Sequence, residues 1–336
     1  MNTFIKYWKK IGMLALLTLL WVFFSITTDT FLTEATIMNI LRQSSIIGIL
    51  SCGVTMIIIT GQTDISVGGR VAFMSVTAAN MLVSGASLLA VIVVVLVLGV
   101  LTGAMNAVLS ETLRTYIFVV SIATMNIWNG ASLLITKGSM IYGFPDSMKA
   151  ISQTRIPILF GVSVPSIVVI WVVCVLITGF ILGKTRFGRQ IYALGGNSEA
   201  AYLAGINIVK VNILVHALAG LFAGIGAIVL LSRAMSATAT VGGSYAFDCI
   251  IACVLGGVLL GGGRGTVWQA ALGVLVVNTL FNGLTILQVG DFWQMVVKGL
   301  IMLVAIGLEA LQRRAKVDLS EDRELKAKEL QQPEET

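Results

Sequence analysis

Apolar runs long enough to cross a lipid bilayer recur along this chain, and they constrain its fold more than any other feature. A helix needs about 20 apolar residues to cross a hydrocarbon core of about 30 Å. Only 11% of the residues are charged, against about 25% in soluble domains, so a water-soluble fold is excluded. The predicted fold class is all-α: a polytopic membrane protein of about ten transmembrane helices, at residues 11–28, 37–60, 67–85, 88–109, 115–136, 162–182, 211–232, 246–262, 267–287 and 293–311.

The basic residues support this number of spans and predict an orientation. Short loops rich in Lys and Arg stay on the cytoplasmic side of a membrane. With ten spans and a cytoplasmic N-terminus, the inside segments hold Lys6, Lys9, Lys10, Arg70, Arg114, Lys184, Arg186, Arg189, Lys210, Arg264, Arg313, Arg314 and Lys316. The outside segments then hold only Arg42, Lys137, Lys149, Arg155 and Arg233. Residues 1–311 are predicted to form the transmembrane domain and 312–336 a charged cytoplasmic tail, with both termini in the cytoplasm.

Catalytic and metal-binding patterns are weak. Gly183-Lys184-Thr185 resembles the end of a phosphate-binding loop, but it follows an apolar helix and lacks the preceding glycine at the required spacing. His216 has no nucleophile or carboxylate constellation readable around it, so we predict neither a catalytic residue nor an enzyme. The cysteines fall in apolar stretches without metal-ligand spacing and are interpreted as packing residues: Cys52, Cys174, Cys249 and Cys253.

Polar side chains at membrane depth are candidates for a solute path, because such groups are costly in a membrane unless they serve a function or pair with each other. The candidates are Asp64, Asn106, Asn126, Asp248, Asn278 and Asn282. Asp64 is equally suited to cap the helix that follows it. Asp248 is placed to complement a helix N-terminal dipole. The four asparagines are as well suited to interhelical hydrogen bonds as to binding a hydroxylated solute.

Small residues four positions apart predict close helix packing rather than chemistry. They occur at Gly99/Gly103, Gly220/Gly224 and Gly257/Gly261.

The inside segment 183–210, between the sixth and seventh spans, predicts a short helix that lies in the cytoplasm. Asn197 or Ser198 can cap this helix, Glu199 favours its first turn, and Gly205 can end it. Such a helix could dock into a groove on another protein and move two transmembrane helices together. An interfacial loop without a partner is the alternative.

Three ordered motifs resemble those of a known family. Residues 59–68 (ITGQTDISVG) are similar to I-x-G-G-I-D-L-S-V-G, and 188–206 match G-R-x-I-Y-A-x-G-G-N-x-E-A-A-x-x-x-G-I. Residues 243–252 with 255–257 and 262–265 resemble a late G-x-Y-x-L-D-x-I-A-A and G-G-x-G-G-R-G pattern. Over residues 36–311 the chain resembles permeases of binding-protein-dependent ABC sugar importers of the ribose, xylose and arabinose type, within the branched-chain amino acid permease superfamily.

The resemblance implies a permease subunit of the bacterial inner membrane that imports a monosaccharide by alternating access. Its implied partners are a cytoplasmic ATP-binding subunit, a periplasmic sugar-binding protein and a second permease copy or paralogue. This chain would bind no cofactor, because ATP and Mg would sit on the partner ATPase. The residues that it implies for ATPase coupling are Asn197, Ser198, Glu199, Ala200, Ala201, Leu203 and Gly205.

An ion-coupled secondary carrier for a small polar solute is the alternative function. Such a carrier needs an ionisable group inside the membrane. Asp64, Asp248 and Lys298 are the candidates for that group.

Overall fold

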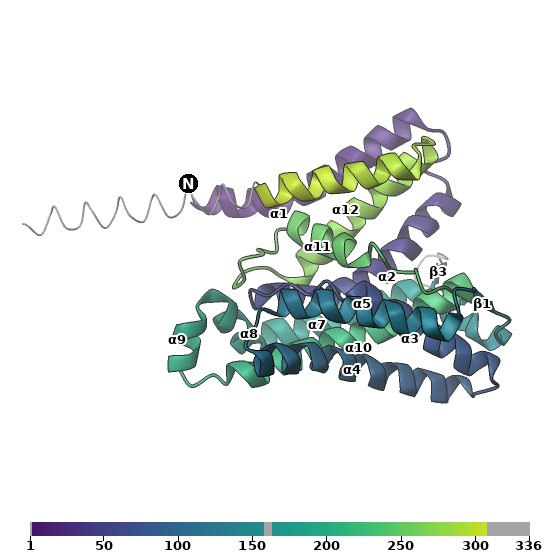
Figure 1. Ribbon diagram of the computed structural model, residues 1–336. Coiled ribbons are helices and arrows are strands. Elements are labelled where there is room, and N and C mark those ends of the chain that lie inside the picture. Colours follow the sequence, from purple (N-terminus) through teal and green to yellow (C-terminus); the bar gives the residue numbers. More distant parts are fainter. Residues whose placement is uncertain (1, 158–162, 308–336) are drawn as a thin grey trace, which may run out of the picture. The chain divides into compact units, whose positions relative to one another are not determined.

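The computed structural model describes residues 2–157 and 163–307, and most of these residues are helical (Figure 1). The longer helices are α1 (Asn2–Thr27), α2 (Glu34–Ile59), α3 (Val67–Val83), α4 (Leu88–Leu113), α5 (Ile117–Thr136), α7 (Ser166–Lys184), α10 (Ile208–Ala234), α11 (Tyr245–Gly256) and α12 (Val267–Ile286). Shorter elements are η1 (Asp146–Met148), α6 (Ala150–Gln153), α8 (Arg186–Gly196) and α9 (Ser198–Leu203). The prediction of an all-α membrane protein is confirmed.

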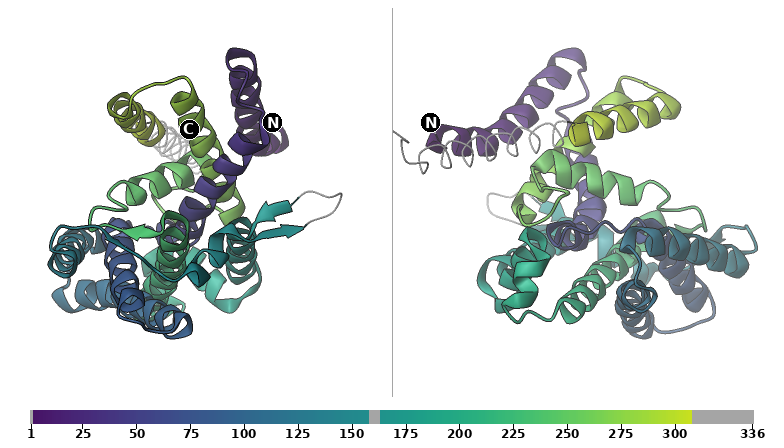
Figure 2. Two further views of the ribbon diagram at one scale, coloured as in Figure 1. Left: turned by 90° about the vertical axis from the view of Figure 1, so that its right-hand side faces the viewer. Right: turned by 60° about the vertical axis from the view of Figure 1, so that its left-hand side comes forward.

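Two small antiparallel ribbons join segments between the helices. Strand β1 (Ile141–Tyr142) pairs with β4 (Ser236–Ala237), and β2 (Arg155–Pro157) pairs with β3 (Ser163–Pro165). The β2–β3 ribbon projects away from the neighbouring helices in the left view of Figure 2. Arg155 on β2 donates from Nη1 to Glu34 Oε1 on α2 over 3.0 Å. This exposed ion pair joins the ribbon to the start of α2.

Among the described residues, six helices are long and apolar enough to cross a membrane: α2, α4, α5, α7, α10 and α12. Shorter apolar stretches lie in α1, α3 and α11, and a further helix occupies 291–307. Within the described residues, each of the ten predicted spans therefore overlaps a helix.

Two predicted spans are shorter than a full crossing. Helix α11 has 12 residues, which at 1.5 Å per residue gives about 18 Å of the 30 Å required. The predicted span 246–262 is thus helical only in its first part, because Gly257 takes a positive φ of 99° and ends the helix. Helix α3, with 17 residues, falls short by about 4 Å on the same reckoning.

Both short helices follow non-helical backbone that is packed in part against other helices of the bundle. Gly69, near the start of α3, lies against the carbonyl of Met125, close to the middle of α5. A Cβ on Gly68 would come within 2.2 Å of the carbonyl oxygen of Gly242, in the turn before α11. Non-helical backbone at membrane depth is tolerated only where protein or a water-filled cavity surrounds it. The contact between Gly68 and Gly242 therefore brings the start of α3 next to the turn before α11.

Helix α2 is the central element, with 89% of its most apolar window buried. Helices α4 and α10 meet through small residues, since a Cβ on Gly220 would lie 1.9 Å from the carbonyl oxygen of Gly99. The predicted close packing at Gly99/Gly103 and Gly220/Gly224 is confirmed. The same prediction for Gly257/Gly261 is wrong, because these residues lie in the turns after α11.

Residues up to Val289 form one compact unit, and the chain from Gly290 belongs to a second. In the second unit the structure describes the helix at 291–307, which includes Lys298. The predicted tail, 312–336, lies outside the described residues.

Candidate functional site

A buried polar cluster lies where the chain leaves α2 and enters α3. We call it the Asp64 cluster: Asp64, Ser66, Arg70, Asn106 and His216. The Asp64 carboxylate accepts hydrogen bonds from Ser66 N (2.8 Å) and Ser66 Oγ (2.6 Å) and forms a 2.8 Å ion pair with Arg70 Nη2. The side chains of Asp64 and Arg70 are 0% exposed. Charges buried so completely must be paired to persist.

Neighbouring helices complete the cluster. Asn106 on α4 donates from Nδ2 to Ser66 Oγ (2.8 Å) and to Asp64 Oδ2 (3.3 Å). His216 on α10 is buried, and its Nδ1 lies 3.0 Å from the carbonyl oxygen of Asn212. The bonds from Asn106 thus fix the start of α3 against α4. Within the described part of the chain, Arg70 Nε and Nη1, Asn106 Oδ1 and His216 Nε2 still lack a hydrogen-bond partner.

One expectation about this cluster is supported and one is wrong. Asp64 Oδ1 accepts from the backbone N of Ser66 (2.8 Å), two residues on, which is a capping bond at the start of α3, although Ser66 occupies the N-cap position itself. Arg70 is not a loop residue in water but the partner of Asp64, inside α3. The expected grouping of Asp64 with Asn106 is present, although both side chains are buried and contact protein groups.

The other candidate path residues lie apart from this cluster. Asn126 is exposed on α5 and donates to the Ile122 carbonyl of its own helix. Asp248 lies in the first turn of α11, as the dipole argument predicted, and accepts from Ser244 Oγ over 2.8 Å. Asn278, on α12, donates to the Val274 carbonyl. These side chains therefore bind groups on their own helices or at their ends.

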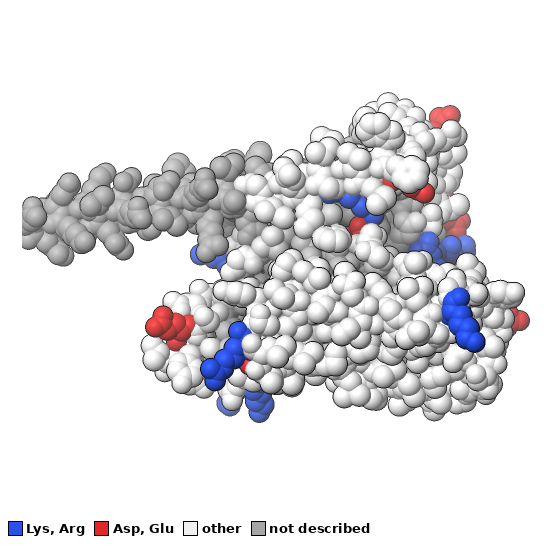
Figure 3. All heavy atoms as spheres, viewed as in Figure 1, with Lys and Arg blue, Asp and Glu red and all other residues white. Residues whose placement is uncertain are grey.

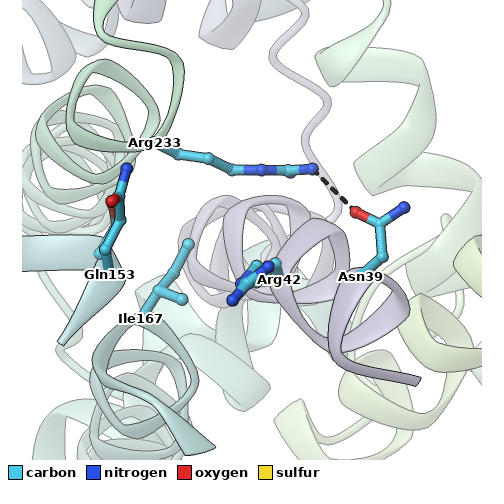
Figure 4. Close-up of a pocket in the computed structure, with 6 residues that line it drawn as sticks. Asn39, Arg42, Gln153, Ile167 and Arg233 are labelled. Carbon is cyan, nitrogen blue, oxygen red and sulfur yellow. Dashed lines mark hydrogen bonds between the residues drawn. The ribbon is translucent and has the colours of Figure 1, made fainter. Parts of the chain in front are cut away.

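Asn282 belongs to a second polar network, between α12 and α2. It donates from Nδ2 to Gln43 Oε1 (2.6 Å) and accepts from Asn39 Nδ2 (3.3 Å). Asn39 Oδ1 in turn accepts from Arg233 Nη2 at the end of α10 (3.3 Å). The network reaches a pocket of about 380 Å³ (Figure 4), lined by Asn39, Arg42, Ser152, Gln153, Ile167 and Arg233.

Sequence reasoning missed this pocket. Its available signal was the spacing of Asn39, Arg42 and Gln43, which puts three polar side chains on one face of an otherwise apolar helix. The other lining residues come from α6, α7 and α10, which only the folded chain brings together.

The predicted cytoplasmic helix is present as α9, preceded by α8. Asn197 Oδ1 accepts from Ala200 N over 2.9 Å and caps α9, as predicted. Gly205 follows with a φ of 80° and ends the turn. Ser198, Glu199, Ala200, Leu203 and Gly205 are exposed, whereas Ala201 is buried. Tyr202 and Leu203 are 68% and 79% exposed, so this short helix presents an apolar surface.

Helix α8 is fastened to two other parts of the bundle. Gly195 packs so closely that a Cβ there would lie 1.8 Å from the Ile59 carbonyl oxygen at the end of α2. The same oxygen accepts from Gly263 N (2.8 Å), in the turn between α11 and α12. Tyr192 Oη donates to the Gly265 carbonyl (2.7 Å), and burial raises the pKa of this phenol. We call these contacts the α8 junction; they join α8 to α2 and to the loop between α11 and α12.

The surface formed by α4 and α5 is apolar between its ends. In Figure 3 the surface over α4 and α5 is free of charged side chains between its ends, and Lys, Arg, Asp and Glu lie toward those ends. Such an apolar band suits contact with lipid. Among the described residues no group of three or more His, Cys, Asp or Glu side chains could hold a metal ion.

Comparison with known proteins identifies the family. Residues 36–306 match the family described as branched-chain amino acid transport system / permease component. The chain is 37% identical to the ribose import permease protein RbsC of Bacillus subtilis (strain 168), over 90% of this chain and 92% of the relative. It is 34% identical to RbsC of Escherichia coli (strain K12), over 90% and 94%.

A third relative carries a different name. The galactose/methyl galactoside import permease protein MglC of E. coli (strain K12) is 32% identical, over 93% of this chain and 97% of the relative. No solved structure matches the chain. The matches extend over most of the chain, and the apolar helices agree with them. The chain therefore belongs to the permease-component family of branched-chain amino acid transport systems and is a multi-pass membrane protein.

Proposed function

We propose that this chain is the permease subunit of an ATP-driven importer in the bacterial inner membrane, with both termini in the cytoplasm. Its solute is a monosaccharide delivered by a periplasmic binding protein. ATP and Mg are bound by a separate cytoplasmic ATPase, and a second permease copy or paralogue completes the membrane part. The similarity to ribose and galactose/methyl galactoside import permeases supports a sugar as the solute.

The observation that carries the proposal is the geometry of α8 and α9. Helix α9 has six residues and leaves the large apolar side chains of Tyr202 and Leu203 exposed. A partner protein that docks on this helix would cover both. Asn197 and Gly205 fix its two ends. The remaining candidate coupling residues, Ser198, Glu199, Ala200 and Ala201, lie in its first turns.

The α8 junction gives a physical route from this surface into the bundle. A force on α9 passes through α8 to the end of α2 and, through Tyr192 and Gly263, to the loop before α12. Closely packed backbones transmit displacement with little slack, because no side chain lies between them to deform. ATPase closure would thereby move α2 and α12 together with α7 and α10, which flank α8 and α9, and open the path to the loaded binding protein.

Asp64, Asn106, Asn126, Asp248, Asn278 and Asn282 remain proposed path or gating residues. The role that we propose for the first two is gating, since their side chains are buried and hydrogen-bonded where α3 begins. A movement of α3 against α4 would have to break or carry these bonds. The binding protein would supply specificity, so a tight sugar site in this chain would only slow release.

Co-purification from detergent extracts tests the docking surface. We expect Leu203→Glu to lose the candidate ATPase encoded beside this chain, because the substitution puts a charge into an apolar contact. Leu113→Glu is the matched control. Leu113 is also an exposed leucine, 64% accessible, and it is the last residue of α4, outside α9. Equal recovery of the ATPase with both variants would refute the assignment.

A further inference from the structure

The pocket at the start of α2 combines two positive charges with no negative one among the described residues that line it. Arg42 comes from α2 and Arg233 from the last turn of α10. Figure 4 shows Arg233 stretching across the pocket toward Asn39, with Arg42 beside Ile167. Both arginines are partly buried. Two guanidinium groups that share one cavity repel each other unless an anion lies between them.

Few of the donors in this pocket are used. Within the described part of the chain Arg42 has no hydrogen-bond or ion-pair partner, and Arg233 has one bond, to Asn39 Oδ1 (3.3 Å). A guanidinium carries five N–H donors in a planar fork. Gln153 adds an amide beside them. The pocket is therefore rich in donors and poor in acceptors, which is the complement of an oxyanion.

Nearby carboxylates are already committed elsewhere. Glu34 is paired with Arg155 at 3.0 Å, and Asp146 is paired with Lys149 at 2.7 Å. Neither of these two acids lines the pocket, so neither neutralises the positive charge there.

We propose that this pocket is a binding site for a compact oxyanion of the phosphate class, held by Arg42 and Arg233. The volume of about 380 Å³ falls in the range of about 300–1,000 Å³ that small-molecule sites occupy. The pocket lies near the start of α2, and the α8 junction lies at the other end of that helix. The anion is thus bound at the end remote from the ATPase surface. Its source is either a soluble phosphate-bearing solute or the phosphate of a lipid headgroup.

The test uses the full-length protein in micelles of dodecyl maltoside, a detergent without phosphate, titrated with inorganic phosphate and followed by ³¹P NMR line width. We expect saturable binding that weakens about 10- to 100-fold in Arg42→Gln and in Arg233→Gln, because each loses a charge-assisted contact. Arg114→Gln, which removes an exposed arginine at the end of α4, outside the pocket, is the matched control and should bind like the parent. Absence of saturable binding to the parent, or unchanged binding by both pocket variants, overturns the proposal.

Two further arms make the result decisive. If a glutamine variant elutes as an aggregate, Arg42→Lys and Arg233→Lys keep the charge but lose the planar fork. An intermediate loss of affinity supports the site, and parent-like affinity overturns it. Adding phosphatidylglycerol to the micelles identifies the source: competition with phosphate assigns the site to a lipid headgroup, and unchanged phosphate binding assigns it to a soluble anion. The proposal does not rest on transport, so its failure leaves the proposed function intact.

Discussion

The ion pair between Asp64 and Arg70 gives the sharpest energetic prediction. Asp64→Asn keeps the shape of the side chain but leaves Arg70 with a buried, uncompensated charge. Removing one partner of a fully buried pair costs about 3–5 kcal/mol, and both side chains here are 0% exposed. The asparagine also keeps only part of the bonding to Ser66 and Asn106, because its amide nitrogen cannot accept from them. We therefore expect a destabilisation at the upper end of that range.

The double variant Asp64→Asn/Arg70→Met separates charge from shape. It removes the orphaned charge as well as the pair, so its cost should lie below the sum of the two single variants by about 1–3 kcal/mol. Unfolding of the purified protein in dodecyl sulfate, followed by circular dichroism, measures each free energy. Two results would refute the description of the cluster: a cost for the double variant equal to the sum of the two single costs, or a cost below about 1 kcal/mol for Asp64→Asn. Either would show that the pair is hydrated or separated.

The remaining predictions concern the α8 junction and helix packing. Gly195→Ala should cost about 1–3 kcal/mol through overpacking, whereas Gly196→Ala, with open space at its Cβ, should cost little in the same unfolding assay. Tyr192→Phe should lower the free energy of unfolding by about 0.5–1.5 kcal/mol, because it removes the hydrogen bond to the Gly265 carbonyl. Because burial raises the pKa of Tyr192 above its ordinary value of 10.0, this difference should stay constant below pH 10 and shrink only as pH rises further and the unfolded phenol ionises. Asn197→Ala should speed amide exchange in α9, since a lost cap costs about 0.5–2 kcal/mol; unchanged exchange would contradict the cap. Gly220→Leu should force α4 from α10 and abolish a monodisperse elution peak, and a normal peak would contradict the close contact.

Local signals predicted the features that depend on a few adjacent residues. The cap at Asn197 and the end at Gly205 follow from side-chain and φ preferences that act within one turn. Helix positions followed from apolar runs, because length and hydropathy decide whether a segment can reside in lipid. The spacing of small residues predicted that helices pack closely at Gly99 and at Gly220. It did not predict that these two residues contact each other, because the spacing does not identify the partner helix.

Tertiary features escaped the sequence for identifiable reasons. The early end of α11 was missed because apolar residues continue past Gly257, and hydropathy does not distinguish a helix from a buried turn. The role of Arg70 was missed because the orientation argument counts every Lys or Arg near the end of a span as a loop residue in water. The carboxylate partner of Arg70 is Asp64, six positions earlier and across a turn. The pocket with Arg42 and Arg233 depends on helices that are distant in sequence, and no local pattern encodes that meeting.

The central claim is that this chain imports a sugar with energy from a separate ATPase. The most direct measurement is uptake of labelled ribose or galactose into proteoliposomes that contain the permease, its candidate ATPase and loaded binding protein, with ATP inside or outside the vesicles and with or without an ionophore. The account predicts uptake only when ATP is on the ATPase side, unaffected by collapse of the ion gradient and absent in Leu203→Glu. Uptake by the permease alone, lost when the ion gradient collapses, would contradict it and identify an ion-coupled secondary carrier.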